Sequence, residues 1–382
     1  MKAQVIDCRS SVVMPGFVDS HTHLVFAGSR VADYEKRLQG ETYDEIARAG
    51  GGIRSSARRV RRASVNSLVR QAEGFLKQFA AHGTTTLEVK TGYGLDVTQE
   101  MKLLEAIRRL RKTSDLELVP TLLAAHTLPP QYAGRPDAYI ETVIRELIPR
   151  VAPVGAHGHA PLQAHGHALL RDPREKLAEF IDCFCDRGAF SVEQCRKVLA
   201  AGKRQGLIPR LHAEQLTHTG ASHLAVEAEA ASADHLDMLS PPDICALARS
   251  QVVATLLPGA IFHLGLKAYP PARKLIDAGA IVALATDFNP GTSPTPNMQF
   301  ILSVACSAMR MTPAEAISAS TINPAYALRR ADRLGSLEAG KQADLIVMDV
   351  GDYREIPYYF AVNHCRMTVK AGHIVWQRRG CQ

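Results

Sequence analysis

The sequence predicts an α/β protein built on a TIM-type (β/α)8 barrel, with a small β-domain beside it. Eight short apolar segments alternate with stretches whose apolar residues recur every three or four positions, as strands alternating with helices do. A chain of 382 residues is long enough for one such barrel and a small second domain. Histidines and aspartates gather where the predicted strands end, and barrels of this kind build their sites on that face.

The eight predicted strands cover residues 12–24, 84–92, 116–127, 179–185, 207–215, 232–237, 251–260 and 280–291. Helical periodicity covers residues 65–83 and 98–112 between them. A further helix opens with a capping-box pattern at Ser191, followed by Glu193 and Gln194, and ends at Gly206. We therefore assign residues 12–334 to the barrel.

Two parts of the chain fall outside this alternation. Residues 335–382 read as short strands, and together with residues 1–11 they predict the small β-domain, built from the chain termini. Residues 154–170 contain "AHGHA" twice. Because glycine and alanine surround each histidine pair, we expect a surface insertion of low complexity here rather than a metal site.

The composition is that of an ordinary globular protein, with 46% hydrophobic and 22% charged residues. No apolar run reaches the roughly 18 residues that a membrane-spanning helix needs. The start, "MKAQVIDCRSS", lacks the apolar core of a secretory signal, and the eight cysteines show no C-x-x-C spacing. We expect a reduced, cytoplasmic protein without membrane contact.

The net charge of +7 is concentrated in residues 54–70. No aromatic residues are interleaved there to stack on bases, so we interpret the segment as a solvated helix face. We expect no nucleic-acid partner.

The segment "GFVDSHTH" places His21 and His23 one residue apart at the end of the first predicted strand. Alternate residues of a strand point to the same side, so both rings could reach one ion. His212 and Asp287 end the fifth and eighth predicted strands. Three imidazoles and a carboxylate suit Zn or Fe(II) and leave a position open for water. We predict one divalent metal ion held by these four residues, with His235 of the sixth strand stabilising an oxyanion or relaying a proton.

The strings "PGFVDSHTH", "LHAE", "SADH" and "ATDFNPG" resemble the amidohydrolase superfamily. More narrowly, "HTHLVFAGSR", "VKTGYGLD", "LAAHTLPPQYAGRPDAYI" and "TDFNPGTSP" are similar to the imidazolonepropionase family of histidine degradation. The resemblance runs from about residue 5 to the end of the chain, apart from the insertion. It implies hydrolysis of the ring amide of 4-imidazolone-5-propanoate to N-formimino-L-glutamate, with one zinc or iron ion and a homodimeric enzyme.

The resemblance implies the same four metal ligands, and it places substrate contacts at Arg30, Tyr43, Tyr93 and His126. An arginine fork can hold the propionate carboxylate through two hydrogen bonds. Asn289 could hold a polar group of the ring.

The chain departs from the family pattern in two places. Some relatives carry a glutamate where this chain has Gln215, an amide that can position substrate but cannot ionise. The predicted catalytic set is therefore His235, Gln215 and Asp287, with Glu214 as an alternative proton carrier. Relatives also have a longer N-terminal segment, so either the start of this chain is placed too late or the small β-domain is truncated. The C-terminal strands would then lack partners and expose a sheet edge.

Three alternatives remain open. Another mononuclear amidohydrolase, a deaminase or a cyclic amidase, would have the same ligands, but a neutral base needs no clamp of Arg30 and Tyr93. A two-metal enzyme would need a lysine ending the fourth strand, where "DCFCDRG" stands instead. An inactive metal-binding barrel is supported only by Gln215 and the short N-terminus. Hydrolysis of imidazolonepropionate by metal-loaded protein would separate these cases.

Overall fold

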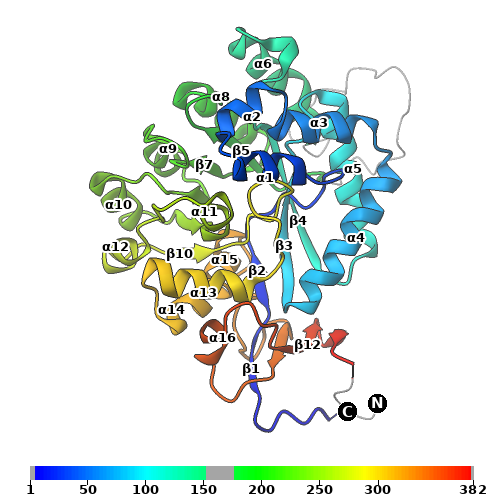
Figure 1. Cartoon of the computed structure of the whole chain (residues 1–382), viewed down its shortest axis with the longest axis vertical. Helices are drawn as coiled ribbons and strands as arrows, with labels where there is room; N and C mark the ends of the chain where they lie inside the picture. The colour runs from blue at the N-terminus through cyan, green and yellow to red at the C-terminus, as the bar shows by residue number, and fades with distance from the viewer. Residues whose placement is uncertain (1–4, 152–175, 380–382) are drawn as a thin grey trace.

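The computed structural model describes residues 5–151 and 176–379, without the side chains of residues 43 and 44 (Figure 1). The predicted insertion at 154–170 lies outside the described residues. Within the described part of the chain, no helix has the length and apolar character needed to cross a membrane.

Eight parallel strands form the predicted barrel, which is confirmed. They are β2 (Phe17–Asp19), β3 (Thr84–Lys90), β4 (Glu117–Ala125), β5 (Phe180–Cys185), β7 (Leu211–Ala213), β8 (Ser232–His235), β9 (Val253–Leu256) and β10 (Val282–Leu284). Each strand pairs with the next in chain order. Beyond their ends, Thr22 and Phe288 form a parallel bridge that brings the last strand beside the first.

Helices surround the strands (Figure 1). They are α1 (Val31–Leu38), α2 (Tyr43–Arg48), α3 (Gly52–Arg62), α4 (Val65–Ala81), α5 (Val97–Thr113), α6 (Pro136–Thr142), α7 (Ile148–Val151), α8 (Val192–Arg204), α9 (Ala221–Glu227), α10 (Pro241–Ala248), α11 (Pro258–Leu264), α12 (Ala272–Asp277), α13 (Met298–Met309), α14 (Pro313–Ser318), α15 (Ile322–Ala327) and α16 (Glu355–Tyr358). A 3-10 turn at Pro130–Tyr132 and a π-helical turn at Val143–Leu147 flank α6.

Local sequence signals account for the helix ends. The predicted capping box opens α8: the Ser191 hydroxyl accepts from the Gln194 backbone N–H, and the Gln194 side chain accepts from the Ser191 N–H. Two otherwise unpaired N–H groups of the first turn are thereby satisfied. Gly206, with φ +73°, ends the segment in the left-handed conformation that glycine tolerates.

The predicted first strand at residues 12–24 is wrong as a single strand. It divides into β1 (Val12–Pro15), which belongs to a separate sheet, and the barrel strand β2. The break falls at Gly16, where an added Cβ would lie 2.3 Å from Thr85 Cγ2. Close contact with β3 requires glycine at this crossing point.

The small β-domain is an antiparallel sheet in the order β1-β11-β12-β13, where β11 is Leu345–Met348, β12 is Cys365–Lys370 and β13 is His373–Gln377. This sheet lies at the end of the barrel where β2 begins (Figure 1). The expectation that the C-terminal strands lack a partner is wrong, because β1 pairs along β11 from Val12 opposite Met348 to Pro15 opposite Leu345.

Candidate functional site

A pocket of about 360 Å³ opens at the carboxyl ends of the barrel strands. The predicted residues that line it are His23, Arg30, Tyr93, His126, His212, Gln215, His235, Asp287 and Asn289. His21 is fully buried behind this lining. The side chain of Tyr43 lies outside the described residues, so its predicted role stays a prediction.

His21 and His23 follow β2, and both approach Asp287, which follows β10. The distance to Asp287 Oδ1 is 3.5 Å from His21 Nε2 and 3.6 Å from His23 Nε2. The His23 backbone N–H donates to Phe288 O at 2.8 Å, which places the two strand ends next to each other. The two ends of the barrel sequence therefore meet at this site.

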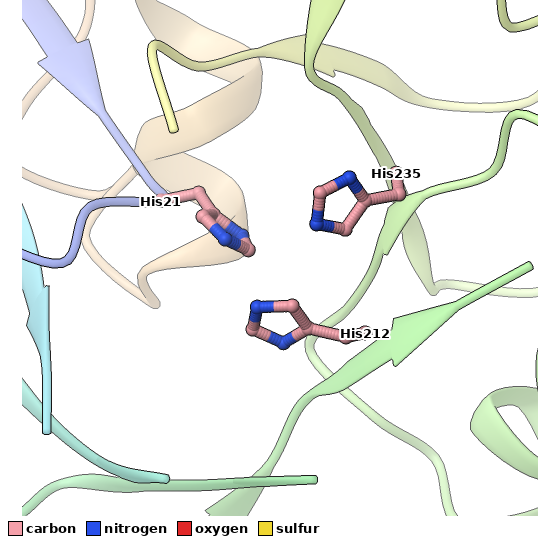
Figure 2. Close-up of side chains that lie close together, drawn as sticks. All are labelled: His21, His212 and His235. Atoms are coloured by element: carbon pink, nitrogen blue, oxygen red, sulfur yellow. The ribbon is translucent and has the colours of Figure 1, made fainter. Parts of the chain in front are cut away.

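Figure 2 shows three imidazole rings that lie close together: His21, which follows β2, His212 of β7 and His235 at the end of β8. The ring centroid of His21 lies 4.5 Å from that of His212 and 5.4 Å from that of His235. The His212 and His235 centroids are 5.2 Å apart.

At this pocket, two overlapping groups of side chains could hold a metal ion, each with ligand atoms within 4.8 Å of one another. One group contains His21, His23 and Asp287, and the other contains His21, His212 and His235. Nε2 of both His21 and His212 is buried and has no hydrogen-bond partner among the described residues. Unpartnered imidazole nitrogens gathered beside one pocket fit a divalent cation.

Burial sets the protonation of these groups. Desolvation, followed by neighbouring charges, holds the pKa values of His21, His23 and His235 well below their usual range, so the rings are neutral and keep a lone pair. Burial raises the pKa of Asp287 to about 8. A cation in contact with this carboxyl would favour its ionised form.

Arg30 is 5% exposed, and its Nη2 donates to Asn289 Oδ1 at 3.2 Å. Among the described residues no carboxylate forms an ion pair with Arg30. A buried guanidinium without an acidic partner is costly unless an anion joins it. The pocket is therefore suited to a negatively charged ligand.

His126 and Tyr93 form another wall of the pocket. The His126 ring stacks on His23 with centroids 5.1 Å apart, and its Nδ1 lies 3.0 Å from Gly92 O. The Tyr93 ring lies 5.8 Å from His23 and is buried. Burial, together with His212, lowers the pKa of His126 to about 3, so this ring is also neutral.

Gln215 and Glu214 point in different directions. Gln215 lines the pocket. Glu214 is fully buried, and its carboxylate accepts from the backbone N–H groups of Thr219 at 2.6 Å and Ser222 at 3.1 Å. The alternative in which Glu214 reaches into the site is wrong, because this carboxylate holds the loop before α9.

Sequence reasoning missed the acidic partners of two histidines. His21 Nδ1 lies 2.7 Å from Asp234 Oδ2, and His212 Nδ1 lies 2.9 Å from Asp182 Oδ2. Both aspartates are fully buried. Charged residues inside apolar strands, as in "EFIDCFC" and "SADH", are the signal that could have indicated them.

Comparison with known proteins agrees with this geometry. The model of the amidohydrolase family matches residues 65–376. The chain is similar to solved barrel enzymes, among them a 5-methylcytosine deaminase from Klebsiella pneumoniae, with a TM-score of 0.75, 16% identity and coverage of 100% of this chain and 91% of that one. E. coli guanine deaminase gives a TM-score of 0.67 at 17% identity, covering 98% of this chain and 86% of that chain. At such identities the likeness concerns the fold.

Curated relatives are much more similar in sequence. Imidazolonepropionase of Geobacillus kaustophilus (strain HTA426) is 46% identical over 374 residues, which are 98% of this chain and 83% of that protein. Imidazolonepropionase of Myxococcus xanthus (strain DK1622) is 43% identical over 380 residues, covering 99% and 85%. The chain belongs to the amidohydrolases and, within them, to the imidazolonepropionase family, hydrolases of a cyclic-amide carbon–nitrogen bond in histidine degradation.

Proposed function

We propose that the pocket hydrolyses the ring amide of 4-imidazolone-5-propanoate to N-formimino-L-glutamate, with one divalent metal ion held by His21, His23, His212 and Asp287. The observation that carries this proposal is the combination, in one pocket, of buried imidazoles with a buried arginine that has no acidic partner among the described residues. The imidazoles suit a metal ion, and the arginine suits the carboxylate of the substrate.

The ligand set admits zinc or iron, because both accept imidazole and carboxylate ligands. Such an ion, when bound, would lower the pKa of a coordinated water and polarise a carbonyl group. His21 belongs to both candidate ligand groups and therefore contributes to the site in either arrangement.

Arg30 is the proposed partner of the propionate. Asn289 orients the guanidinium through the bond to Nη2, and a planar fork can hold a carboxylate at two points. Tyr93 and His126 form the pocket wall beside His23, and we assign them to the ring. Tyr43 completes the proposed substrate contacts by family resemblance alone.

Hydrolysis requires one proton to leave the attacking water and one to reach the departing ring nitrogen. His235 is the proposed carrier, because it faces His21 and His212 and lines the pocket. Asp287 and Gln215 complete the catalytic set, and the Gln215 amide can position the substrate without exchanging a proton.

We further propose that the enzyme acts as a cytoplasmic homodimer. The described cysteines are free thiols, as a reduced compartment favours. The dimer is proposed from the family resemblance.

The test is hydrolysis by protein stripped of metal and then loaded with Zn(II) or Fe(II). We expect the imidazolone absorbance to fall only with loaded protein, and the more active ion to be the one that binds at one equivalent per chain. Cytosine and guanine serve as control substrates. Their deamination, without loss of imidazolonepropionate, would overturn the proposal in favour of a deaminase, and inactivity toward all three would favour an inactive barrel.

A further inference from the structure

A cluster of fully buried charged side chains lies beside the proposed metal ligands: Glu88, Lys90, Asp182, Arg210 and Asp234. Lys90 is the centre of this cluster. Its Nζ lies 2.8 Å from Glu88 Oε1, 2.8 Å from Asp182 Oδ2 and 3.6 Å from Asp234 Oδ2. Burial opposes the charge, but Asp182 and Glu88 outweigh it and raise the pKa of Lys90, so the group is an ammonium.

The same carboxylates contact the histidines. Asp234 Oδ2, which approaches Lys90, also lies 2.7 Å from His21 Nδ1. Asp182 Oδ2 is shared between Lys90 Nζ and His212 Nδ1, at 2.8 Å and 2.9 Å, and its Oδ1 accepts from the His212 backbone N–H at 3.1 Å. A single carboxylate thus lies between Lys90 and each of the two imidazoles.

Glu88 extends the contact to the backbone of the H-x-H segment. Its Oε2 accepts from the N–H of Thr22, the residue between His21 and His23, at 3.1 Å, while its Oε1 contacts Lys90. Arg210 approaches Asp234 at 3.2 Å and Glu88 at 4.0 Å. Lys90 is therefore the cation that joins all three carboxylates.

We propose that Lys90 is a positioning residue for the metal centre. It holds Asp234, which accepts from His21 Nδ1, and Asp182, whose Oδ2 lies 2.9 Å from His212 Nδ1, so that Nε2 of both rings stays free to bind the ion. This inference rests on the proposed metal site. A carboxylate behind a ligating imidazole fixes the tautomer and orientation of the ring, and losing such a partner typically weakens metal binding about 10–100-fold.

The experiment compares Lys90→Met with a matched control, Lys370→Met. Lys370 is also a buried lysine between two carboxylates, 2.7 Å from Asp344 Oδ2 and 3.2 Å from Glu117 Oε2, but it belongs to the small sheet. Both variants should lose thermal stability, because each removes a cation from beside buried carboxylates. The Kd of metal-free protein for Zn(II), measured by competition with a chromogenic chelator, should rise about 10–100-fold for Lys90→Met. Lys370→Met should bind Zn(II) as the wild type does.

Equal Zn(II) affinity of the two variants would overturn the role of Lys90 and leave the metal site intact. Absence of Zn(II) binding by the wild type would overturn the proposed metal site and this inference with it. Should Lys90→Met not fold, the imidazole ¹⁵N NMR signals of the metal-free wild type report which ring nitrogen of each histidine carries the proton. His21 and His212 should carry the proton on Nδ1, with Asp234→Asn used to assign His21, and a proton on Nε2 of both would reject the proposal.

Discussion

His235 and Asp287 hold backbone conformations that non-glycine residues rarely adopt, with φ of 82° and 51°. Each such residue costs on the order of 1–3 kcal/mol unless its surroundings enforce it. The Leu236 N–H donates to Ala213 O at 3.1 Å, and Asn289 Nδ2 donates to Asp287 O at 2.7 Å. These bonds maintain the strained turns that aim both side chains into the pocket.

Arg30→Ala should raise KM for imidazolonepropionate by about 10–100-fold, because a charge-assisted hydrogen bond is worth roughly 1.5–3 kcal/mol. Metal content should stay at the wild-type level, since Arg30 is outside both candidate ligand groups. Arg30→Lys should recover only part of the loss, because a point charge cannot reproduce the planar fork. Steady-state kinetics and metal analysis measure both effects. Wild-type KM in both variants would remove Arg30 from the substrate site.

His235→Asn should lower turnover by roughly 10²–10⁴-fold, the usual scale for losing a general acid or base, while metal content remains near normal. Gln215→Glu should retain or raise activity. Single-turnover rates together with metal content test this. A His235→Asn protein that loses its metal would make His235 a ligand, and one with wild-type turnover would move the proton transfer elsewhere.

At the scale of the element, the loop between β10 and α13 orders the substrate side of the pocket. Asn289 Oδ1 accepts from the backbone N–H groups of Gly291 and Thr292, both at 2.8 Å, and from Arg30 Nη2. The loop therefore stabilises itself and the guanidinium through one amide oxygen.

Gly291→Ala should displace Arg30 and raise KM, because the added Cβ would lie 2.1 Å from Arg30 Cζ. The fold should persist, since the clash is with the end of a long side chain. Gly74→Ala is the matched control: nothing lies within 4 Å of its added Cβ, and alanine favours the helix by about 1 kcal/mol. Kinetics and thermal melts of the pair measure the effect. Equal KM values would show that Arg30 can move without loss of binding.

At the scale of the whole molecule, Glu117 joins the barrel to the small sheet. This residue begins β4, and its carboxylate contacts Lys370 of β12 at 3.2 Å and Arg330 at 2.9 Å, and also pairs with Arg333. Burial alone would raise the pKa of Glu117, but Lys370 and the two arginines lower it to about 2.

A folded-state pKa below the unfolded value stabilises the protein above the unfolded pKa, and this contribution disappears as pH falls through the folded pKa. We expect Glu117→Gln to lower the free energy of unfolding by about 1–2 kcal/mol at pH 7, allowing for solvent screening. The difference from wild type should shrink from about pH 4.5 and vanish near pH 2. Urea unfolding at several pH values measures it, with the exposed Glu229→Gln as a control expected to change little. A difference that stays constant with pH would show that the ionised carboxylate is not the cause.

The sequence by itself determined the strand–helix alternation, the barrel, and which polar residues stand at the strand ends. Alternation and helical periodicity are local, so helices such as α4 and α8 could be predicted from their own residues. The same locality limits what the sequence can predict. The predicted strand at 12–24 is one apolar run, and only the contact with Thr85 shows why the chain changes sheets at Gly16.

Only the tertiary structure decided how the charged groups pair. Glu214 and Gln215 are neighbours in sequence, yet one carboxylate holds a loop and the other side chain faces the pocket. The acidic partner of His21 is Asp234, 213 residues away. A charge can enter the interior of a barrel only where an opposite charge or a hydrogen bond meets it. Which side chain meets it depends on the closure of the strands into a barrel, and no local pattern records that closure.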